Sequence, residues 1–219
     1  MEKDRIKPIA KAHIVYRASD GKRVPGATTI TGLLNKTYLI KWANNLGLEG
    51  IDSSKYTDES AAVGTLAHEM VQANLQGYKV DTSMYSPIQV SLAENSVLSF
   101  LEWKSRHRIE PIICEVPMVS DTLRFGGTVD CYCMLDGKPT LLDFKTGKAI
   151  YDEYFVQVSA YKELLLEAGH PVERVQILRI GRDETEGFEE RAITDTTKYF
   201  NIFANLLDIY YIKRELGWK

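Results

Sequence analysis

The feature that most constrains the fold is a change of hydrophobic period after Pro111. Over residues 58–76 and 86–104 the apolar side chains recur at helical spacing. The stretches IICEVPMVS, TLRFGGTVDCYCML and PTLLDFKT instead alternate with the period of two that is typical of strands. Asp136-Gly137, between the last two stretches, is the preferred pair for a two-residue hairpin turn. We therefore expect an antiparallel meander that is preceded by helices.

The rest of the chain is expected to surround this meander with further helices and strands. In chain order these are short strands over 13–31 around Asp20-Gly21, a helix over 33–46, a helix over 154–168, strands over 175–180 and 188–193, and a helix over 195–216. Helices, a meander, another helix and then further strands are the pattern of an α/β (α+β mixed-sheet) fold. The sequence predicts a central mixed β-sheet flanked by helices.

The composition is that of one ordinary globular domain. The 219 residues are 44% hydrophobic and 26% charged, which excludes the disordered and disulfide-scaffold classes. We expect a single domain with a basic N-terminal appendage over 1–57, a core over 58–193 and a C-terminal helix over 194–219. No apolar run reaches the roughly 18 residues of a membrane span, and the first residues lack the apolar core of a signal peptide. We therefore expect a cytoplasmic protein without a membrane partner.

The charge is distributed unevenly along the chain. The net charge is −3, yet residues 1–50 contain nine Lys and Arg against four Asp and Glu. A basic arm beside an acidic body is compatible with a site for a polyanion, provided that cations neutralise the acidic part. An unevenly charged, solvated surface would explain the same numbers.

The hairpin turn brings two acidic residues together. With Asp136-Gly137 as a two-residue loop, Asp130 lies opposite Asp143, and both side chains project from one face of the sheet with Cβ atoms about 5 Å apart. Lys145 would share that face. Neighbouring carboxylates repel each other, and a divalent ion that prefers oxygen ligands, such as Mg²⁺, would compensate for this repulsion. The alternative is a salt bridge in which Lys145 neutralises the pair without a metal.

Four short motifs occur in the order found in one nuclease family. They are GTLAHE, which contains His68, FGGTVD, which ends at Asp130, LLDFKTGK, which contains Asp143 and Lys145, and QVSAY, which runs from Gln157 to Tyr161. Together they resemble the motifs of the PD-(D/E)XK nuclease superfamily and, within it, those of the RecB-type exonuclease branch. The resemblance covers residues 64–161 and implies a restriction-endonuclease-like core.

The resemblance also implies a role for each motif residue. One or two Mg²⁺ or Mn²⁺ ions would be held by His68, Asp130, Asp143 and the backbone carbonyl of Phe144, with Glu115 as a supporting acid. Lys145 would orient the attacking water or stabilise the charge that develops on the phosphate. Gln157 and Tyr161 lie four residues apart on one helical face and would place the scissile phosphate. The implied catalytic residues are Asp130, Asp143, Lys145, Gln157 and Tyr161.

The cysteines set this chain apart from the iron–sulfur members of that branch. Those members use one cysteine upstream of the nuclease motifs and three near the C-terminus, whereas this chain has only Cys114, Cys131 and Cys133. We expect no iron–sulfur cluster, and we expect the three cysteines to be reduced thiols in the core.

The expected function is that of a metal-dependent DNA exonuclease that hydrolyses phosphodiester bonds in recombination or end processing, in a phage or mobile element. Its partner would be DNA, as ends or single strands, with a recombination protein or helicase as a possible second partner. Lys104, Arg106 and Arg108 are candidate contacts to the DNA backbone. Three alternatives stay open: a catalytically silent nucleic-acid-binding module, a structure-specific endonuclease, and a structural domain whose motif residues form an ion network.

Overall fold

A single mixed sheet forms the centre of the protein. The computed structural model describes residues 14–218. Its sheet has the strand order β1-β2-β3-β4-β5, in which β3 and β4 are parallel and the other neighbours are antiparallel. The strands are β1 (Ile109–Ser120), β2 (Phe125–Leu135), β3 (Lys138–Lys145), β4 (Arg174–Ile180) and β5 (Phe188–Ile193). The expected mixed sheet is confirmed.

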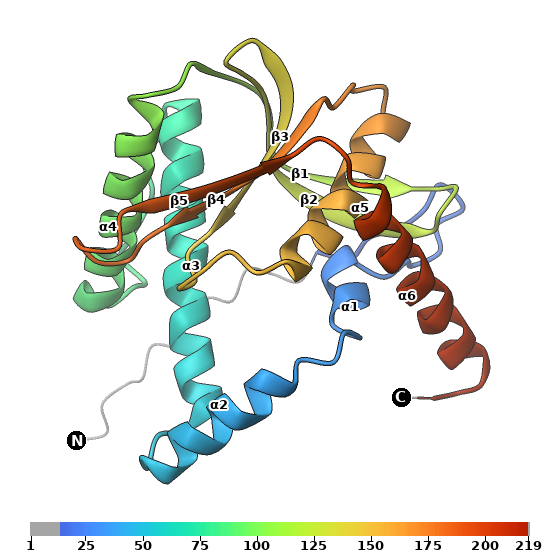
Figure 1. Cartoon of the computed structure of the whole chain (residues 1–219), viewed down its shortest axis with the longest axis horizontal. Helices are drawn as coiled ribbons and strands as arrows, with labels where there is room; N and C mark the ends of the chain where they lie inside the picture. The colour runs from blue at the N-terminus through green and yellow to red at the C-terminus, as the bar shows by residue number, and fades with distance from the viewer. Residues whose placement is uncertain (1–13, 219) are drawn as a thin grey trace.

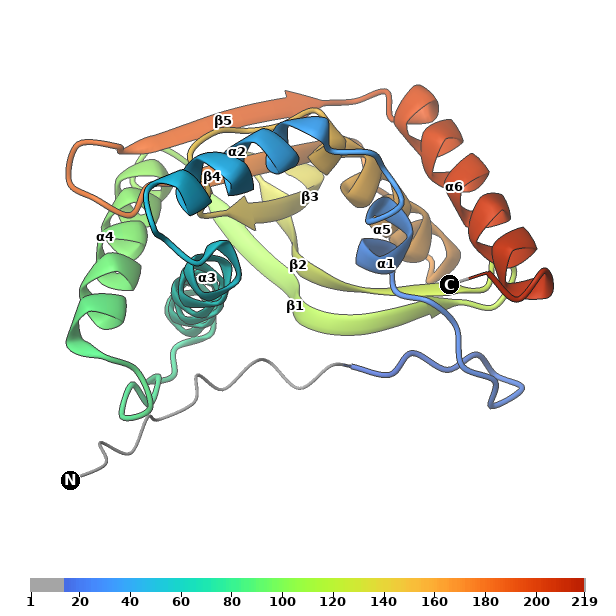
Figure 2. The same ribbon diagram turned by 90° about the horizontal axis from the view of Figure 1, so that it is seen from below.

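Helices cover both faces of this sheet, which confirms the predicted fold class (Figure 1). On one face lie α3 (Ser53–Gln76) and α4 (Pro87–Lys104), and on the other lie α5 (Glu153–Glu167), α1 (Ala27–Thr31) and α6 (Thr197–Glu215). The remaining helix, α2 (Thr37–Leu48), has no buried residue and runs from the α1 side of the molecule to the α3 side (Figure 2). Among residues 14–218, every helix is too short or too polar to span a membrane.

Local sequence signals explain where the two long helices of the first layer begin and end. The Asp52 side chain accepts hydrogen bonds from the backbone N–H groups of Ser54 and Lys55 and so caps the start of α3. Gly77 ends α3 in the left-handed conformation that glycine adopts without steric cost. A capping box between Ser86 and Gln89 starts α4.

The hairpin between β2 and β3 has the predicted geometry. Asp136 and Gly137 have φ values of 52° and 79°, as a two-residue turn with both central residues in the left-handed region requires. Leu135 pairs with Lys138, and the ladder continues as far as Cys131 opposite Leu142. Asp130 and Asp143 are the next residue on each strand, so the register brings them side by side at the open end of the ladder.

Two apolar clusters hold the layers together. Cys131 and Cys133 pack with side chains of α3 and α4, and all three cysteines are buried and free. This confirms the expectation of core thiols. Val129, which strict alternation would place with these cysteines, packs instead in the other cluster, which includes the side chains of α5.

The N-terminal segment is only partly as expected. Arg17 and Arg23 form an antiparallel bridge around the predicted turn, and Gly26 forms a parallel bridge with Gly126. The expected strand character ends there, because Ala27–Thr31 is a helix. The two threonines at positions 28 and 29 favour a strand in isolation, whereas the burial of Ala27 and Ile30 in the α5 layer favours the helix. Residue 13, the first of the predicted segment, lies outside the described residues.

Candidate metal centre and the groove beside it

Three of the predicted ligands meet between α3 and the sheet. One ligand atom from each of His68, Glu115 and Asp130 lies within 4.8 Å of the other two. The His68 Nδ1 atom is 3.5 Å from Asp130 Oδ2 and 3.8 Å from Glu115 Oε1. The α3 helix, β1 and β2 each supply one of the three side chains. Two carboxylates and an imidazole form a donor set that can hold a divalent metal ion.

Glu115 reaches this group through an unusual backbone conformation. It lies between the pairs Cys114↔Cys131 and Val116↔Val129, and therefore opposite Asp130. Its φ is 53°, in the left-handed region that residues other than glycine rarely adopt. Such a conformation costs roughly 1–3 kcal/mol and is commonly found at functional sites. The acid that the resemblance assigns to β1 thus lies with His68 and Asp130.

Asp143 is a buried carboxylate with too few partners. Its side chain is 1% exposed, and its Oδ1 atom has no hydrogen-bond partner among residues 14–218. Its Oδ2 atom forms an ion pair with Lys145 Nζ at 2.6 Å. Asp143 is not part of the group of three, although its charge acts on Asp130. A buried carboxylate oxygen without a donor is costly in an apolar interior, and a bound cation would relieve that cost.

Asp130 also ties the two acid-bearing strands together. Its Oδ2 atom accepts a hydrogen bond of 2.9 Å from the backbone N–H of Phe144. This bond fixes the carboxylate of β2 beside the segment of β3 that contains Asp143 and Lys145. The backbone carbonyl of Phe144 is predicted to be a metal ligand, and this role stays a prediction.

The charges of this cluster shift one another's pKa values. Burial, together with the charge of Asp143, raises the pKa of Asp130 to about 6 against the opposing charges of His68 and Lys145. Burial alone would lower the pKa of His68 and of Lys145, but the neighbouring acids outweigh it and hold both pKa values above their ordinary range. The acids therefore dominate the electrostatics, and both basic groups are favoured in their charged forms.

The raised pKa of Asp130 predicts a stability effect in the absence of metal. Because the folded-state pKa exceeds the ordinary value of 3.8, the ionised carboxylate destabilises the fold, and this penalty develops as the pH rises from about 4 to about 6. Asp130→Asn keeps an acceptor for the Phe144 N–H. At pH 8 in EDTA it should raise the Tm by a few degrees, since about 1 kcal/mol corresponds to about 2–4 °C for a chain of this size.

Two comparisons check this effect. The gain from Asp130→Asn should be about half as large at pH 5, midway through the range over which the penalty develops, and Asp208→Asn on the exposed surface of α6 should leave the Tm unchanged at both pH values. A lower Tm for Asp130→Asn at pH 8 would contradict the expectation. It would mean that the charge of Asp130 stabilises the fold by pairing with His68.

Gln157 and Tyr161 lie on α5 beside the same centre. The Gln157 amide donates a 2.7 Å hydrogen bond to the Tyr161 hydroxyl, so the predicted pair forms one polar unit. The Tyr161 ring lies against the backbone of Gly127, where a Cβ atom would come within 2.4 Å of it. At Gly126 a Cβ atom would come within 2.4 Å of the Tyr16 ring. The two glycines of FGGTVD are thus needed for the close approach of two tyrosines.

A groove with a volume of about 1170 Å³ lies beside the candidate metal centre. Glu115, Asp130 and Tyr161 line it where it meets the centre. Its other walls, from the N-terminal segment and α6, carry four cations: Arg17, Lys22, Arg23 and Arg214. Two acids of the candidate metal centre and these four cations therefore lie along one continuous surface.

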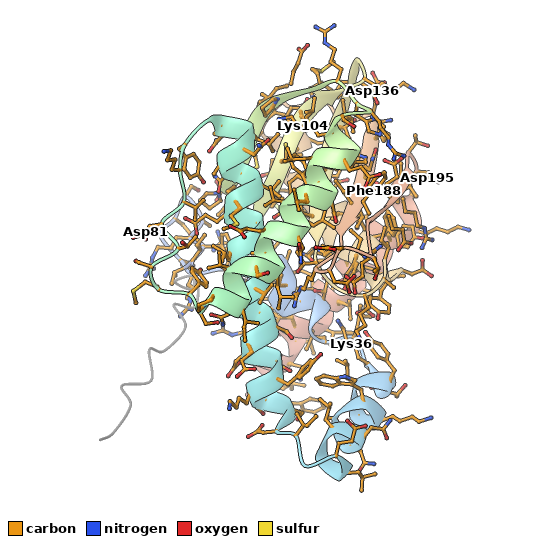
Figure 3. The ribbon with its side chains drawn as sticks, turned by 90° about the vertical axis from the view of Figure 1, so that its left-hand side faces the viewer. Lys36, Asp81, Lys104, Asp136, Phe188 and Asp195 are labelled. Atoms are coloured by element: carbon orange, nitrogen blue, oxygen red, sulfur yellow. The ribbon has the colours of Figure 1, made fainter. Side chains whose placement is uncertain are left out.

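The basic cluster that was predicted to contact DNA lies elsewhere. Figure 3 shows Lys104 and Asp136 at the same end of the molecule, where the hairpin closes. Arg106 and Arg108 form 2.6 Å ion pairs with Glu102 and Glu110. The structure does not bring this cluster together with the carboxylates, and its role in DNA binding stays a prediction.

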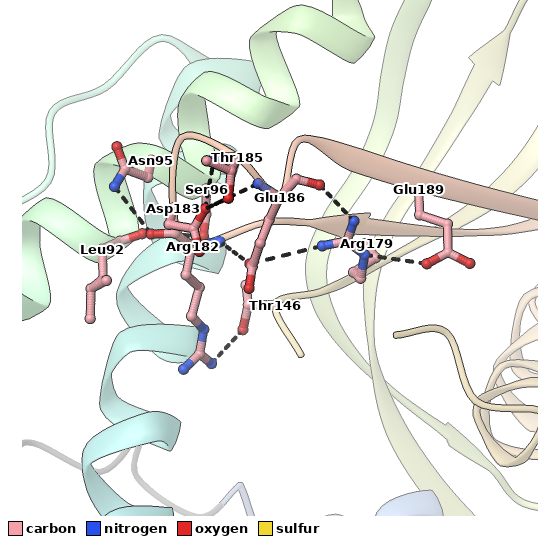
Figure 4. A network of polar contacts seen from close by, with 10 residues as sticks. All are labelled: Leu92, Asn95, Ser96, Thr146, Arg179, Arg182, Asp183, Thr185, Glu186 and Glu189. Carbon is pink, nitrogen blue, oxygen red and sulfur yellow. Dashed lines mark hydrogen bonds and ion pairs between the residues drawn. The ribbon is translucent and has the colours of Figure 1, made fainter. Parts of the chain in front are cut away.

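An arginine network fixes the chain just after Lys145 (Figure 4). Arg182 donates hydrogen bonds to the Thr146 hydroxyl at 2.8 Å and to the Ser60 carbonyl at 3.0 Å. The backbone carbonyl of Arg182 accepts a bond from Asn95 on α4. Arg182 thus links the end of β3 to both helices of the α3 layer. Sequence reasoning missed this residue, which belongs to none of the four motifs.

Comparisons with known proteins give a similarity of fold. No family model and no curated protein matches the chain. It is similar to the structure of an alkaline exonuclease from Laribacter hongkongensis, with 11% identity and a TM-score of 0.41 over 88% of this chain and 92% of that one. It is also similar to the exonuclease LHK-Exo in complex with dAMP, with 14% identity and a TM-score of 0.36 over 70% of this chain and 84% of that one. At these values the similarity concerns the fold alone.

Proposed function

We propose that the protein is a Mg²⁺- or Mn²⁺-dependent DNA exonuclease. The observation that carries this proposal is the buried carboxylate of Asp143, which lacks a hydrogen-bond donor at Oδ1 and lies close to the group of His68, Glu115 and Asp130. A purely structural ion network would satisfy a carboxylate that is buried so completely. A cation site explains both the unsatisfied oxygen and the concentration of acids around it.

The residues divide the chemical work between them. His68, Glu115, Asp130 and Asp143 would hold one or two ions, with the Phe144 carbonyl as a further ligand. When bound, the metal lowers the pKa of a water molecule and offsets charge on the phosphate. Gln157 and Tyr161 would position the scissile phosphate by hydrogen bonds to its oxygens.

Lys145 has a role that follows from its pKa. Asp143 and Asp130 raise this pKa against the effect of burial, so the ammonium keeps its proton at neutral pH. A protonated amine cannot act as a general base. Lys145 would instead stabilise the negative charge that develops on the phosphate, or donate a hydrogen bond to the attacking water.

The groove favours a nucleic acid as the substrate. Its four cations lie on the surface that continues from Glu115 and Asp130, so a strand whose phosphate reaches the metal centre would pass along them. Contacts between cations and backbone phosphates supply affinity without reading sequence. We propose Arg17, Lys22, Arg23 and Arg214 as DNA contacts, in addition to the predicted cluster at Lys104, Arg106 and Arg108.

The groove contacts predict a change in salt dependence. Replacing Arg17 and Arg23 together by glutamine should weaken DNA binding in EDTA by about tenfold or more and should reduce the slope of log K against log salt by about 1–2. Fluorescence anisotropy over a range of salt concentrations measures both. Lys198→Gln, an exposed change on α6, is the control. An unchanged slope for the double variant would remove the groove from the proposal.

The same double substitution at Arg106 and Arg108 tests the predicted cluster. Their ion pairs with Glu102 and Glu110 already neutralise much of their charge, so we expect a smaller change in slope than at the groove. A larger change there would place the DNA path at the hairpin end of the molecule.

The experiment that tests the proposed activity compares two DNA forms. End-labelled linear DNA and covalently closed circular DNA are incubated with the protein and Mg²⁺ or EDTA. We expect the linear DNA to be digested only with Mg²⁺ and the circle to stay intact. Digestion of the circle would show an endonuclease, and binding of either DNA without digestion would show a catalytically silent module.

We propose that this activity serves recombination or end processing, in a phage or together with a helicase partner.

A further inference from the structure

Three tyrosines form a continuous row from the protein surface to Lys145. The Tyr38 and Tyr151 rings stack with their centroids 6.0 Å apart and their planes 16° apart. Tyr151 in turn contacts Tyr154 edge to face, with centroids 5.5 Å apart. The Lys145 ammonium lies 5.1 Å from the centroid of the Tyr154 ring, close enough for a cation–π contact. The inner end of the row therefore contacts Lys145, a residue of the proposed catalytic set.

The outer two rings are open to solvent. Tyr38 is 46% exposed and Tyr151 is 40% exposed. An aromatic ring that fills a core is buried, as the ring of Phe155 on α5 is. The helix that contains Tyr38 buries no residue at all. Packing alone does not account for two parallel, half-exposed aromatic rings at this place.

The exposed end of the row is held in position. Lys36 Nζ forms a 2.6 Å ion pair with Glu153 Oε1, and the Tyr38 hydroxyl donates a 2.9 Å hydrogen bond to the same oxygen. Glu153 begins α5, the helix that also carries Tyr154, Gln157 and Tyr161. The start of α2 is thereby fastened to the helix of the catalytic centre, and the stacking surface is preorganised for a ligand.

We propose that Tyr38, Tyr151 and Tyr154 form a stacking platform for unpaired bases of the substrate strand beside the metal centre. This inference rests on the proposed nuclease function. Aromatic side chains bind single strands without regard to sequence because every base has a π face. The site would then take nucleotides from a single strand or from a frayed duplex end.

The need for unpaired bases follows from the geometry of a duplex. A base inside a duplex is stacked on both sides by its neighbours, so its face is closed to a protein ring, and contact with a platform requires unstacking. The groove cations can hold phosphates of paired and unpaired DNA alike. The tyrosines would therefore supply a preference for unpaired nucleotides that the groove cannot.

The test uses substitutions that separate ring stacking from side-chain volume. Tyr151→Leu keeps an apolar side chain but removes the π face, whereas Tyr151→Phe keeps the face. Tyr78→Leu, at a tyrosine that is 43% exposed in the segment after α3, is the matched control. Binding of the full chain to a labelled single strand and to a blunt duplex is measured in EDTA, so that no cleavage occurs. The same strand with abasic sites throughout is the matched substrate.

We expect Tyr151→Leu to weaken single-strand binding about tenfold, and Tyr151→Phe and Tyr78→Leu to change it by less than about twofold. Binding to the abasic strand should be equally weak for the native protein and for Tyr151→Leu, because neither can form the stack. Equal affinity of Tyr151→Leu and the native protein for the normal strand would overturn the inference. If the native protein binds and cleaves DNA with Mg²⁺ while Tyr151→Leu shows no defect, only the platform fails. A native protein that neither binds nor cleaves DNA would remove the proposed function itself.

Discussion

Lys145→Ala should lower the rate of DNA cleavage by roughly 10²–10³-fold, because it removes the cation that would stabilise the developing charge on the phosphate. The same substitution leaves Asp143 buried without its counter-charge, and breaking a buried ion pair from one side costs about 3–5 kcal/mol. The Tm in EDTA should therefore fall. Mn²⁺ should restore part of it, since the metal can replace the ammonium as the partner of Asp143.

The two readouts for Lys145→Ala separate a catalytic role from a structural one. Single-turnover cleavage with Mn²⁺, under conditions where the variant is folded, isolates the chemical step. Lys148→Ala, at an exposed lysine in the connection that follows β3, is the control. Cleavage by Lys145→Ala at the native rate would show that the lysine only neutralises Asp143.

Asp143→Asn should abolish cleavage and should also abolish the stabilisation by Mn²⁺. An amide cannot supply the negative charge that a divalent ion requires of this buried position. In EDTA the variant should be less stable than the native protein, because it leaves the Lys145 ammonium without its 2.6 Å partner. Thermal denaturation with and without Mn²⁺ measures both effects, together with a cleavage assay.

The exposed surface offers a control for this result. Asp152 lies one residue before the start of α5, is 74% exposed and forms an ion pair with Arg191. Asp152→Asn removes this exposed charge. It should cleave DNA and respond to Mn²⁺ as the native protein does. If Asp143→Asn kept a native Mn²⁺ shift, Asp143 would have no part in metal binding, and its ion pair with Lys145 would be structural.

The sequence predicted those parts of the fold that local chemistry decides. The Asp136-Gly137 turn needs two residues with positive φ, and this requirement alone sets the register that places Asp130 beside Asp143. The capping box at Ser86 and the glycine that ends α3 are signals of the same local kind. The helix over residues 27–31 was missed because its formation depends on burial against α5, which no short stretch of sequence reveals.

The sequence identified the residues of the candidate site, but it did not show which of their ligand atoms lie closest together. The motifs identified His68, Asp130 and Asp143, but they did not indicate that Asp143 would stand outside the closest group of ligands. The left-handed backbone of Glu115 has no sequence signal, since glutamate rarely adopts it. Its place opposite Asp130 depends on strand pairing across the sheet.

The groove and the tyrosine row depend on contacts between distant parts of the chain. The Tyr16 hydroxyl is 2.9 Å from that of Thr128, and Tyr38 bonds to Glu153, so segments more than a hundred residues apart meet at the centre. The excess of Lys and Arg in residues 1–50 was the one sequence signal for the cations that the N-terminal segment brings to the groove. It did not show which cations line the groove.

The central claim is that His68, Glu115, Asp130 and Asp143 share a divalent cation. Crystals grown with Mn²⁺, measured at a wavelength where manganese scatters anomalously, test it most directly. We expect an anomalous peak between the carboxylates of Asp130 and Asp143, within about 2.0–2.3 Å of an oxygen atom of each. A map with no peak at these residues, or with manganese bound only at other acids, would contradict the claim.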